Sequence, residues 1–286
     1  MPRQARIDAP GCLHHVICRG IERRDIFRDG TDINLAAPTY PGENMPQHRQ
    51  LSAALIAEAE KWDGIRAGVA AIDKVLDGPS YKAAAGVNWE DDHSEQTTPW
   101  LPNARSLLVL AMHHPEDDPR LDWFDRGNTA GNRRLTEISE ALVAWLLRTH
   151  GVNAQALAYQ VERGGVYLKD AAVFAGLGVV GKNNLILHPR WGPRVRLRSV
   201  LIEARLSPGR PLEDFDPCRR CAMPCRKVCP KSAFSQGQYY RPACIERLDS
   251  DRDHPIDSGQ RDFEGSPILV TEWCRRCEFT CPVGAK

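Results

Sequence analysis

The sequence lacks three features that commonly identify a partner or a compartment. Its 286 residues carry a formal net charge of only +1 and no strongly basic or acidic block, so the composition requires neither a nucleic acid nor an anionic membrane as partner. It contains no run of about 18 apolar residues that could span a bilayer. Residues 1–6 lead into no apolar signal-peptide core, so we expect a cytoplasmic protein with no membrane partner.

Cysteine, in contrast, is plentiful, and its spacing carries most of the information in the sequence. Ten cysteines in a reducing compartment favour metal or redox chemistry over a disulfide framework. Eight of them form two runs, which are Cys218, Cys221, Cys225 and Cys229 before Pro230, and Cys244, Cys274, Cys277 and Cys281 before Pro282. Both runs close with the same x3-C-P phrase.

This arrangement is typical of a ferredoxin-like module with two [4Fe-4S] clusters, in which the fourth cysteine of each run ligates the cluster of the other run. One cluster would be held by Cys218, Cys221, Cys225 and Cys281, and the other by Cys229, Cys244, Cys274 and Cys277. Soft, anionic thiolates suit such clusters because they stabilise the delocalised charge of the iron atoms. Two zinc sites of four cysteines each are the alternative, although zinc does not require the Cys-Pro ending.

The order of apolar and polar segments predicts an α/β (α+β) domain at 50–207, followed by the small ferredoxin-like domain at 208–286. Ahead of them we expect a separate segment at 1–32 and a proline-rich linker at 33–49. Helices are predicted over 50–62, 131–150 and 169–175, and strands over 64–72, 106–112, 157–161, 185–188 and 195–204. Gly151 is the expected stop of the longest helix.

The segment 175-AGLGVVGKNN-184 spaces its glycines as two nucleotide-binding motifs do. A dinucleotide-binding G-x-G-x-x-G must follow a strand and open a helix, whereas here a helix is predicted before the loop and a strand after it. A phosphate-binding G-x4-G-K-[ST] loop requires Ser or Thr where Asn183 stands. What remains is a tight turn in which Gly176 ends a helix, or a loop for a different ligand.

The first 32 residues carry a recognisable pattern of their own. It comprises Arg6, Ile7, Pro10, Gly11, His14, His15, Val16, Arg19 and Gly20, followed by 26-IFRD-29. This pattern resembles the N-terminus of IS200-like, REP-associated transposases, which cut DNA with a metal-binding histidine pair and a distant tyrosine. Nothing after Asp32 continues that family's pattern, so the resemblance implies a truncated fusion segment without catalytic competence.

Three phrases follow one another within residues 51–286. They are P-x-A-R-S-L at 102–107, A-G-L-G-x-x-G-K-N at 175–183 and the double cysteine run. Together they resemble epoxyqueuosine reductase. The resemblance implies an oxidoreductase in which single electrons pass through two [4Fe-4S] clusters to a base-off cobalamin, which removes the epoxide oxygen from a tRNA nucleoside. It also implies an electron donor such as ferredoxin or flavodoxin, and a corrinoid bed that includes Gly176, Gly178, Gly181, Lys182 and Asn183.

Two further site predictions remain, and each of them has an alternative interpretation. Counting back from the glycine loop places the family's acidic proton donor at Glu162, without the family's accompanying proline; an exposed loop glutamate is the other interpretation. Arg194, Arg196 and Arg198 alternate along a predicted strand, where they could meet a phosphate or a corrinoid side chain, or line a solvent-facing edge. The competing function for the whole chain is a non-catalytic ferredoxin-type electron-transfer protein.

Overall fold

The computed structural model describes residues 45–84, 98–235, 237 and 239–284. The predicted transposase-like segment 1–32 and most of the predicted linker lie outside these described residues. Of the helices that are described, none combines the length and the apolar character needed to cross a membrane.

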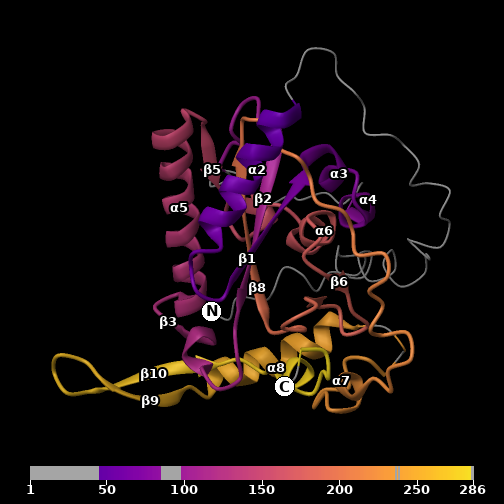
Figure 1. Cartoon of the computed structure of the whole chain (residues 1–286). Helices are drawn as coiled ribbons and strands as arrows, with labels where there is room; N and C mark the ends of the chain where they lie inside the picture. The colour runs from indigo at the N-terminus through magenta and orange to yellow at the C-terminus, as the bar shows by residue number, and fades with distance from the viewer. Residues whose placement is uncertain (1–44, 85–97, 236, 238, 285–286) are drawn as a thin grey trace.

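A four-stranded antiparallel sheet forms the centre of the α/β domain (Figure 1). Its strands lie in the order β1 (Ile65–Ala71), β2 (Ser106–His113), β8 (Val195–Ile202) and β5 (Ala154–Ala156). The two middle strands, β2 and β8, pair from Ser106 opposite Ile202 to His113 opposite Val195. The strands predicted at 64–72, 106–112 and 195–204 are therefore confirmed.

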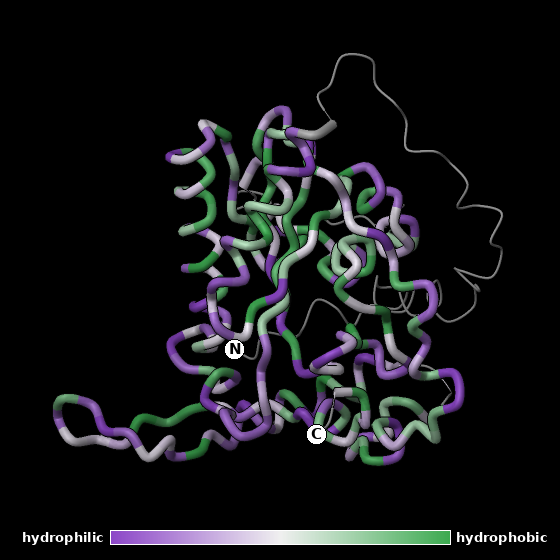
Figure 2. The backbone as a smooth tube through the Cα atoms, viewed as in Figure 1, coloured by the Kyte–Doolittle hydropathy of each residue, from purple (hydrophilic) through white to green (hydrophobic). Residues whose placement is uncertain are grey.

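Helices cover both faces of this sheet, which explains why β2 is apolar throughout. Leu108, Leu110 and Met112 pack with α2 (Met45–Ala59) and α5 (Ala130–His150) on one face. Their neighbours Leu107 and Val109 pack with α6 (Leu168–Phe174) on the other face, because successive side chains of a strand point to opposite sides. Figure 2 shows hydrophobic residues gathered along the central strands.

The longest helix, α5, has clear signals at both ends. The Thr129 side chain accepts a hydrogen bond from the backbone N–H of Asn132 at 3.1 Å, which caps the first turn. At the other end Gly151 has a φ of 64°, a left-handed conformation that glycine adopts without strain. The helix predicted over 131–150, with Gly151 as its stop, is confirmed.

Two predicted boundaries were wrong. Helix α2 begins at Met45, inside the predicted linker, and ends at Ala59 rather than at 62. Strand β5 covers Ala154–Ala156 instead of 157–161, and the 3-10 turn η3 (Val161–Arg163) occupies the end of the predicted strand. The chain cannot remain extended there because Gly164 follows in a left-handed turn with a φ of 91°.

The remaining elements are short. Helices α3 (Ile72–Leu76) and α4 (Pro79–Ala84) follow β1, and the 3-10 turn η2 (Pro119–Asp122) precedes β3 (Trp123–Asp125) and β4 (Asn128–Thr129). The C-terminal module contains α7 (Pro224–Lys227), α8 (Arg241–Asp253), β9 (Ile256–Arg261), β10 (Pro267–Glu272) and α9 (Arg276–Phe279).

A second sheet joins the C-terminal module to the α/β domain. Its order is β4-β3-β10-β9, so the hairpin β9–β10 pairs directly with β3. Figure 1 shows this hairpin extending away from the body of the molecule, below the central sheet. The mixed α/β fold expected from the sequence is confirmed, with the cysteine-rich module seated at one end of the central sheet.

Candidate functional site

The eight cysteines of the C-terminal module lie on short helices and turns. Cys225 lies on α7, Cys244 on α8 and Cys277 on α9, and α7 packs against α9. Cys225 and Cys281 are buried and the others are half-buried, and none forms a disulfide. The packing of α7 on α9 thus brings Cys225 and Cys277 to neighbouring helices, although they are far apart in the sequence.

Electrostatic effects between these thiols act mostly within two sets that the sequence pattern also gives, although Cys225 acts on Cys277 as well. We call Cys218, Cys221, Cys225 and Cys281 the first sulfur group, and Cys229, Cys244, Cys274 and Cys277 the second sulfur group. Burial raises thiol pKa values in both groups, and negative charge on other members raises them further. Cys281 thus acts together with thiols of the first run, and Cys229 acts on Cys244 of the second run. The crossed ligation of two clusters stays a prediction.

A zinc site would require four sulfurs close together. Zinc binds thiolates at about 2.3 Å, so four ligating sulfurs would lie within about 4 Å of one another. Within the described part of the chain, no three His, Cys, Asp or Glu side chains are arranged to hold a single metal ion. The spacing thus gives no support to the two zinc sites that the sequence left open.

The glycine loop, residues 176–184, touches the first sulfur group directly. The backbone N–H of Lys182 donates to Sγ of Cys218 at 3.5 Å. The carbonyl of the same residue accepts two hydrogen bonds from the Arg226 side chain, at 3.0 and 3.2 Å. Both backbone groups of one loop residue are therefore held by the cysteine module, which fixes the loop beside Cys218.

The glycines of this loop have a packing reason. Gly176 follows α6 with a φ of 74°, in the left-handed region. Behind it β6 (Val179–Val180) pairs with β7 (Ile186–Leu187), so the loop is a small hairpin between a helix and a strand. A Cβ at Gly178 would lie 2.5 Å from the Leu187 carbonyl oxygen, and one at Gly181 would lie 2.7 Å from a methyl carbon of the same leucine. No helix follows, so both nucleotide-binding readings remain excluded.

Asn183 offers a polar group that the described protein leaves unused. The residue is only 4% exposed, and its Oδ1 accepts a 3.3 Å hydrogen bond from the backbone N–H of Leu185. Its Nδ2 is buried and has no hydrogen-bond partner among the residues that the structure describes. A buried amide donor without a partner is costly, so this atom fits a ligand that accepts a hydrogen bond.

Glu162 lies exposed on the 3-10 turn η3, ahead of α6. Its charge acts on Tyr167, whose pKa is raised mainly by burial. Lys169, in the first turn of α6, donates to the carbonyl and the Oδ1 of Asn184 at 3.1 and 2.8 Å. The glycine loop therefore returns to the end of α6 that Glu162 precedes, and the role of Glu162 as an acid stays a prediction.

A compensated group of charges joins the module to the domain, and we call Asp122, Arg196, Arg275 and Glu278 the junction network. Asp122 lies 2.6 Å from Arg275 and 2.9 Å from Arg196, while Glu278 lies 2.7 Å from Arg275 and 3.1 Å from Arg196. His114 adds a 2.9 Å contact to Asp122. Burial alone would raise the pKa of the Asp122 carboxyl. The His114 hydrogen bond and the Arg196 charge outweigh burial and hold this pKa at about 2.

The other two arginines of this segment, Arg194 just before β8 and Arg198 on β8, are also engaged inside the protein. Arg194 is 6% exposed and donates to the carbonyl oxygens of Glu278 and Val283 at 3.1 and 2.7 Å. Arg198 is 4% exposed and donates to Oδ1 of Asn132 on α5. The suggestion of a solvent-facing strand edge was wrong, because β8 is a central strand and this face lies against α5 and the cysteine module.

Sequence reasoning missed a group of rings and cations around Trp191. The rings of His113 and His188 stack on the Trp191 ring at 5.1 and 4.6 Å between centroids. The guanidinium carbons of Arg66 and Arg190 lie 5.5 and 6.0 Å from the same centroid. We call these five residues the Trp191 cluster. The phrase 188-HPRW-191 was its only local signal, since Arg66 and His113 arrive there through strand pairing.

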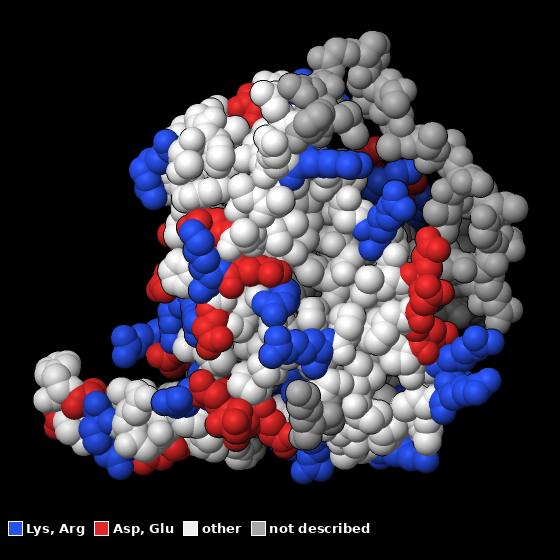
Figure 3. All heavy atoms as spheres, in the orientation of Figure 1, with Lys and Arg blue, Asp and Glu red and all other residues white. Residues whose placement is uncertain are grey.

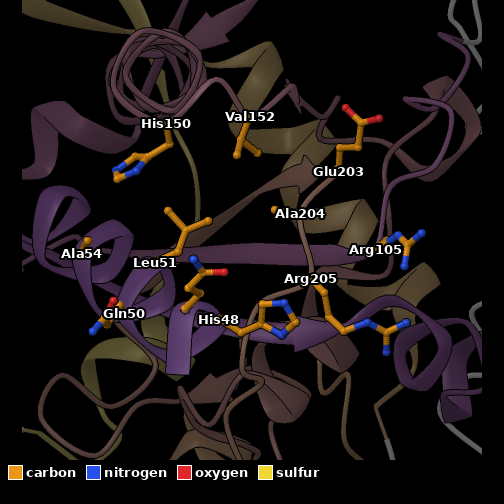
Figure 4. A pocket seen from close by; sticks show the side chains of 11 residues that line it. His48, Gln50, Leu51, Ala54, Arg105, His150, Val152, Glu203, Ala204 and Arg205 are labelled. Carbon is orange, nitrogen blue, oxygen red and sulfur yellow. The ribbon is translucent and has the colours of Figure 1, made fainter. Parts of the chain in front are cut away.

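A pocket of about 730 Å³ opens elsewhere, at the end of the sheet where Ser106 pairs with Ile202 (Figure 4). Its lining includes His48 and Leu51 of α2, His150 of α5, and Arg105 and Arg205 beside the strand ends. It contains Arg105 of the phrase at 102–107, but none of the residues predicted to bind a metal or cofactor or to act in catalysis. The sulfur groups, the glycine loop and the Trp191 cluster lie outside this pocket.

Comparison with known proteins gives the relationship. No family model matches the chain. Its sequence is 26% identical over 208 residues to the epoxyqueuosine reductase of Bacillus cereus, an alignment that covers 68% of this chain and 52% of that protein. The chain thus spans about half the length of the curated relatives it matches.

Solved structures share the fold. One is an epoxyqueuosine reductase with an epoxyqueuosine-modified tRNA-Tyr stem loop, with a TM-score of 0.56, 21% identity, and coverage of 82% of this chain and 65% of that one. Another is a reductive dehalogenase described as suggesting a mechanism for B12-dependent dehalogenation, with a TM-score of 0.52, 19% identity, and coverage of 87% and 34%. The chain is therefore similar in sequence to epoxyqueuosine reductases over about two thirds of its length, and it shares their fold.

Proposed function

We propose that the chain is a corrinoid-dependent, epoxyqueuosine-reductase-like oxidoreductase that carries two [4Fe-4S] clusters. The observation that carries this proposal is the 3.5 Å hydrogen bond from the Lys182 backbone to Cys218. It sets the loop that the resemblance assigns to a corrinoid beside a group of thiols suited to an iron-sulfur cluster. Electrons leaving the first sulfur group would have only a short distance to cross.

In this proposal the first sulfur group holds one cluster and the second sulfur group holds the other. Backbone N–H groups already point at three of the sulfurs: Lys182 at Cys218, Met223 at Cys221 at 3.4 Å, and Ala233 at Cys229 at 3.3 Å. Such donors stabilise anionic cluster sulfur and help to set its reduction potential. The residues present therefore fit two cubane clusters.

The corrinoid would lie against Gly176, Gly178, Gly181, Lys182 and Asn183, with the unpartnered Nδ2 of Asn183 as the best-fitting contact. When bound, its reduced cobalt would supply the electrons that remove an oxygen atom from an epoxide. The chain itself would hold the corrinoid and keep the loop fixed through Arg226. The Glu162 carboxyl would supply a proton to the departing oxygen.

The proposed substrate is a tRNA nucleoside, and the proposed electron donor is a small carrier such as ferredoxin or flavodoxin. Support for tRNA comes from the homology and from a shared fold with a reductase whose structure contains a tRNA stem loop. A simple electron carrier is less well supported. An alignment over 68% of the chain cannot fit inside residues 208–286, so the similarity extends well into the α/β domain.

Electron paramagnetic resonance of the anaerobically reconstituted protein tests this function. Cob(II)alamin is added first and dithionite second. A base-off cobalt signal followed by two sets of reduced cluster signals is expected, and it would justify turnover assays with epoxyqueuosine-containing tRNA. Cluster signals with cobalamin left base-on would contradict the corrinoid role and leave an electron carrier.

Matched serine variants test the crossed ligation. Cys281→Ser should diminish the signal of the cluster bound by the first run, although Cys281 belongs to the second run. Cys229→Ser should diminish the other signal. If each variant instead lost the signal of the cluster bound by its own run, the crossed assignment would be contradicted.

We also propose that residues 1–32 are a transposase-like addition without a catalytic role. The intact mass of the protein purified from cells shows whether translation starts at Met1 or at Met45. A deletion of residues 1–32 should leave cluster content and cobalamin binding unchanged.

A further inference from the structure

The Trp191 cluster gathers side chains from three separate segments, and two of these side chains, Arg66 and Arg190, are cations. Arg66 is the second residue of β1, His113 is the last residue of β2, and His188, Arg190 and Trp191 belong to the loop before β8. Pairing of β1 with β2 brings the first two segments together, and His113 donates its backbone N–H to the Gly64 carbonyl at 2.8 Å. Both guanidinium groups lie within 6.0 Å of one ring centroid, so they are at most about 12 Å apart.

The loop that carries Trp191 is held rigidly. His188 and Gly192 exchange two backbone hydrogen bonds, of 2.9 and 2.8 Å. Nδ1 of His188 accepts a 3.1 Å hydrogen bond from the backbone N–H of Arg190. Trp191 and His188 are each 7% exposed, whereas Arg190 is exposed. A buried ring thus supports a cation that faces solvent.

The positive charge of this cluster is poorly compensated. The ion pairs of the described residues give Arg66 one carboxylate, Glu60, at 4.0 Å, and give Arg190 none. Oε1 of Glu60 also accepts the backbone N–H of Ala67, at 3.2 Å. Burial, Arg66 and Arg190 together lower the pKa of His188 to about 4, as expected where cations are not neutralised. A bound anion would remove this repulsion.

The cluster lies beside the first sulfur group. A Cβ at Gly192 would lie 1.9 Å from the Val283 carbonyl oxygen, and one at Gly284 would lie 2.4 Å from the Trp191 carbonyl carbon. The Trp191 loop therefore packs without a gap on the turn that follows Cys281. Arg194 fastens the same turn through Val283. A ligand held by this cluster would sit next to the proposed reaction centre.

We infer that Arg66 and Arg190 of the Trp191 cluster bind a phosphodiester, with Trp191 as the platform that positions both guanidinium groups. Guanidinium forks match the geometry of phosphate oxygens, and stacking on an aromatic face pre-organises them. The inference rests on the proposed function, which offers two sources of this group. One is the backbone of an RNA substrate, and the other is the nucleotide tail of a cobalamin.

The RNA arm measures binding of an unmodified anticodon stem-loop RNA to the full-length protein by fluorescence anisotropy over a range of salt concentrations. The double variant Arg66→Gln/Arg190→Gln should weaken binding about tenfold or more at low salt, and should reduce the salt slope by about one per arginine. The matched control is Arg148→Gln/Arg261→Gln, which removes two exposed arginines outside the cluster. It should retain wild-type affinity. Arg66→Lys/Arg190→Lys keeps the charge and should restore most of the salt slope.

The corrinoid arm compares cobalamin with cobinamide, which lacks the nucleotide tail and its phosphodiester. If the tail is the ligand, the double glutamine variant should lose affinity for cobalamin about tenfold while its affinity for cobinamide stays unchanged. If RNA is the ligand, both corrinoids should bind as they do to the wild type.

Either result, loss of RNA binding or loss of cobalamin binding, supports the phosphodiester site and identifies its source. Wild-type binding of both ligands by the double glutamine variant overturns it. These readouts are separate from the cluster and base-off cobalt signals, which test the proposed function. The reductase proposal can therefore stand while the phosphodiester site fails.

Discussion

Two groups of arginines lie at the same end of the central sheet, and they differ in their partners. Arg196 and Arg275 of the junction network share two carboxylates, Asp122 and Glu278, at distances of 2.6 to 3.1 Å. Arg66 and Arg190 of the Trp191 cluster share an aromatic ring, and of the two only Arg66 has a carboxylate nearby among the described residues, Glu60 at 4.0 Å. Carboxylates of the protein neutralise the charges of the first pair, whereas the charges of the second pair are poorly neutralised.

This difference indicates a structural role for the junction network and a binding role for the Trp191 cluster. A buried ion pair with good geometry holds two parts of a protein together. Removing one partner leaves the other as a buried charge that nothing neutralises, which is strongly destabilising. A cation that has no close carboxylate is instead able to bind an anionic ligand. Figure 3 shows charges of both signs interspersed on the outer surface, so net charge alone could not reveal either group.

The largest effect is expected from breaking the compensated group. Asp122→Ala would leave Glu278 as the one carboxylate shared by Arg196 and Arg275, and should lower the free energy of unfolding by about 3–5 kcal/mol. Urea unfolding of the anaerobically reconstituted protein measures this. Asp257→Ala is the control, because this carboxylate is exposed on β9 and interacts there with Arg261 and with the backbone N–H of Gly259. A loss for Asp122→Ala as small as that of the control would show that the junction network is not structural.

A second, smaller effect concerns how His188 of the Trp191 cluster makes the free energy of unfolding depend on pH. The folded pKa of His188 is about 4, below its usual 6.5, so the unfolded chain binds its proton more readily. The associated stability is fully present above pH 6.5 and is lost as the pH falls toward 4, by about 3 kcal/mol in total. His188→Gln should remove this loss, so the difference in unfolding free energy between wild type and variant should shrink as the pH falls. A constant difference would contradict the assigned environment.

The apolar pattern predicted the parts of the fold that depend on neighbouring residues. The run 106–112 and the stripe of α5 could be read directly, since burial on one or both faces leaves a local period. The Trp191 cluster and the junction network could not, because Arg66 meets Trp191 and Asp122 meets Arg275 only after distant strands pair. A repeated motif in the sequence predicts how the cysteines group. The unpartnered amide of Asn183 has no such local signal, because it depends on which distant groups lie near the side chain.

A third effect should come from that amide. Asn183→Leu removes a buried donor without a described partner and an acceptor for the Leu185 N–H, so its stability should change by no more than about 1 kcal/mol. Cobalamin affinity should fall about fivefold to tenfold, as for one lost hydrogen bond. Equilibrium titration monitored by absorbance measures it, with the exposed Asn153→Leu as control. Unchanged affinity would mean that Asn183 faces something other than the corrinoid.

The smallest effect is expected at Lys182, although this residue touches the first sulfur group. The contact to Cys218 uses the backbone N–H and the contact from Arg226 uses the carbonyl, so Lys182→Ala should keep both. Its stability should change by less than about 0.5 kcal/mol. Loss of the nearby positive charge should only lower the midpoint potential of the adjacent cluster slightly. Arg226→Gln removes the side chain that grips the loop, so it should perturb the cluster signal more. Paramagnetic redox titration of both variants decides this, and the reverse order would show that the lysine charge, not the loop position, governs the site.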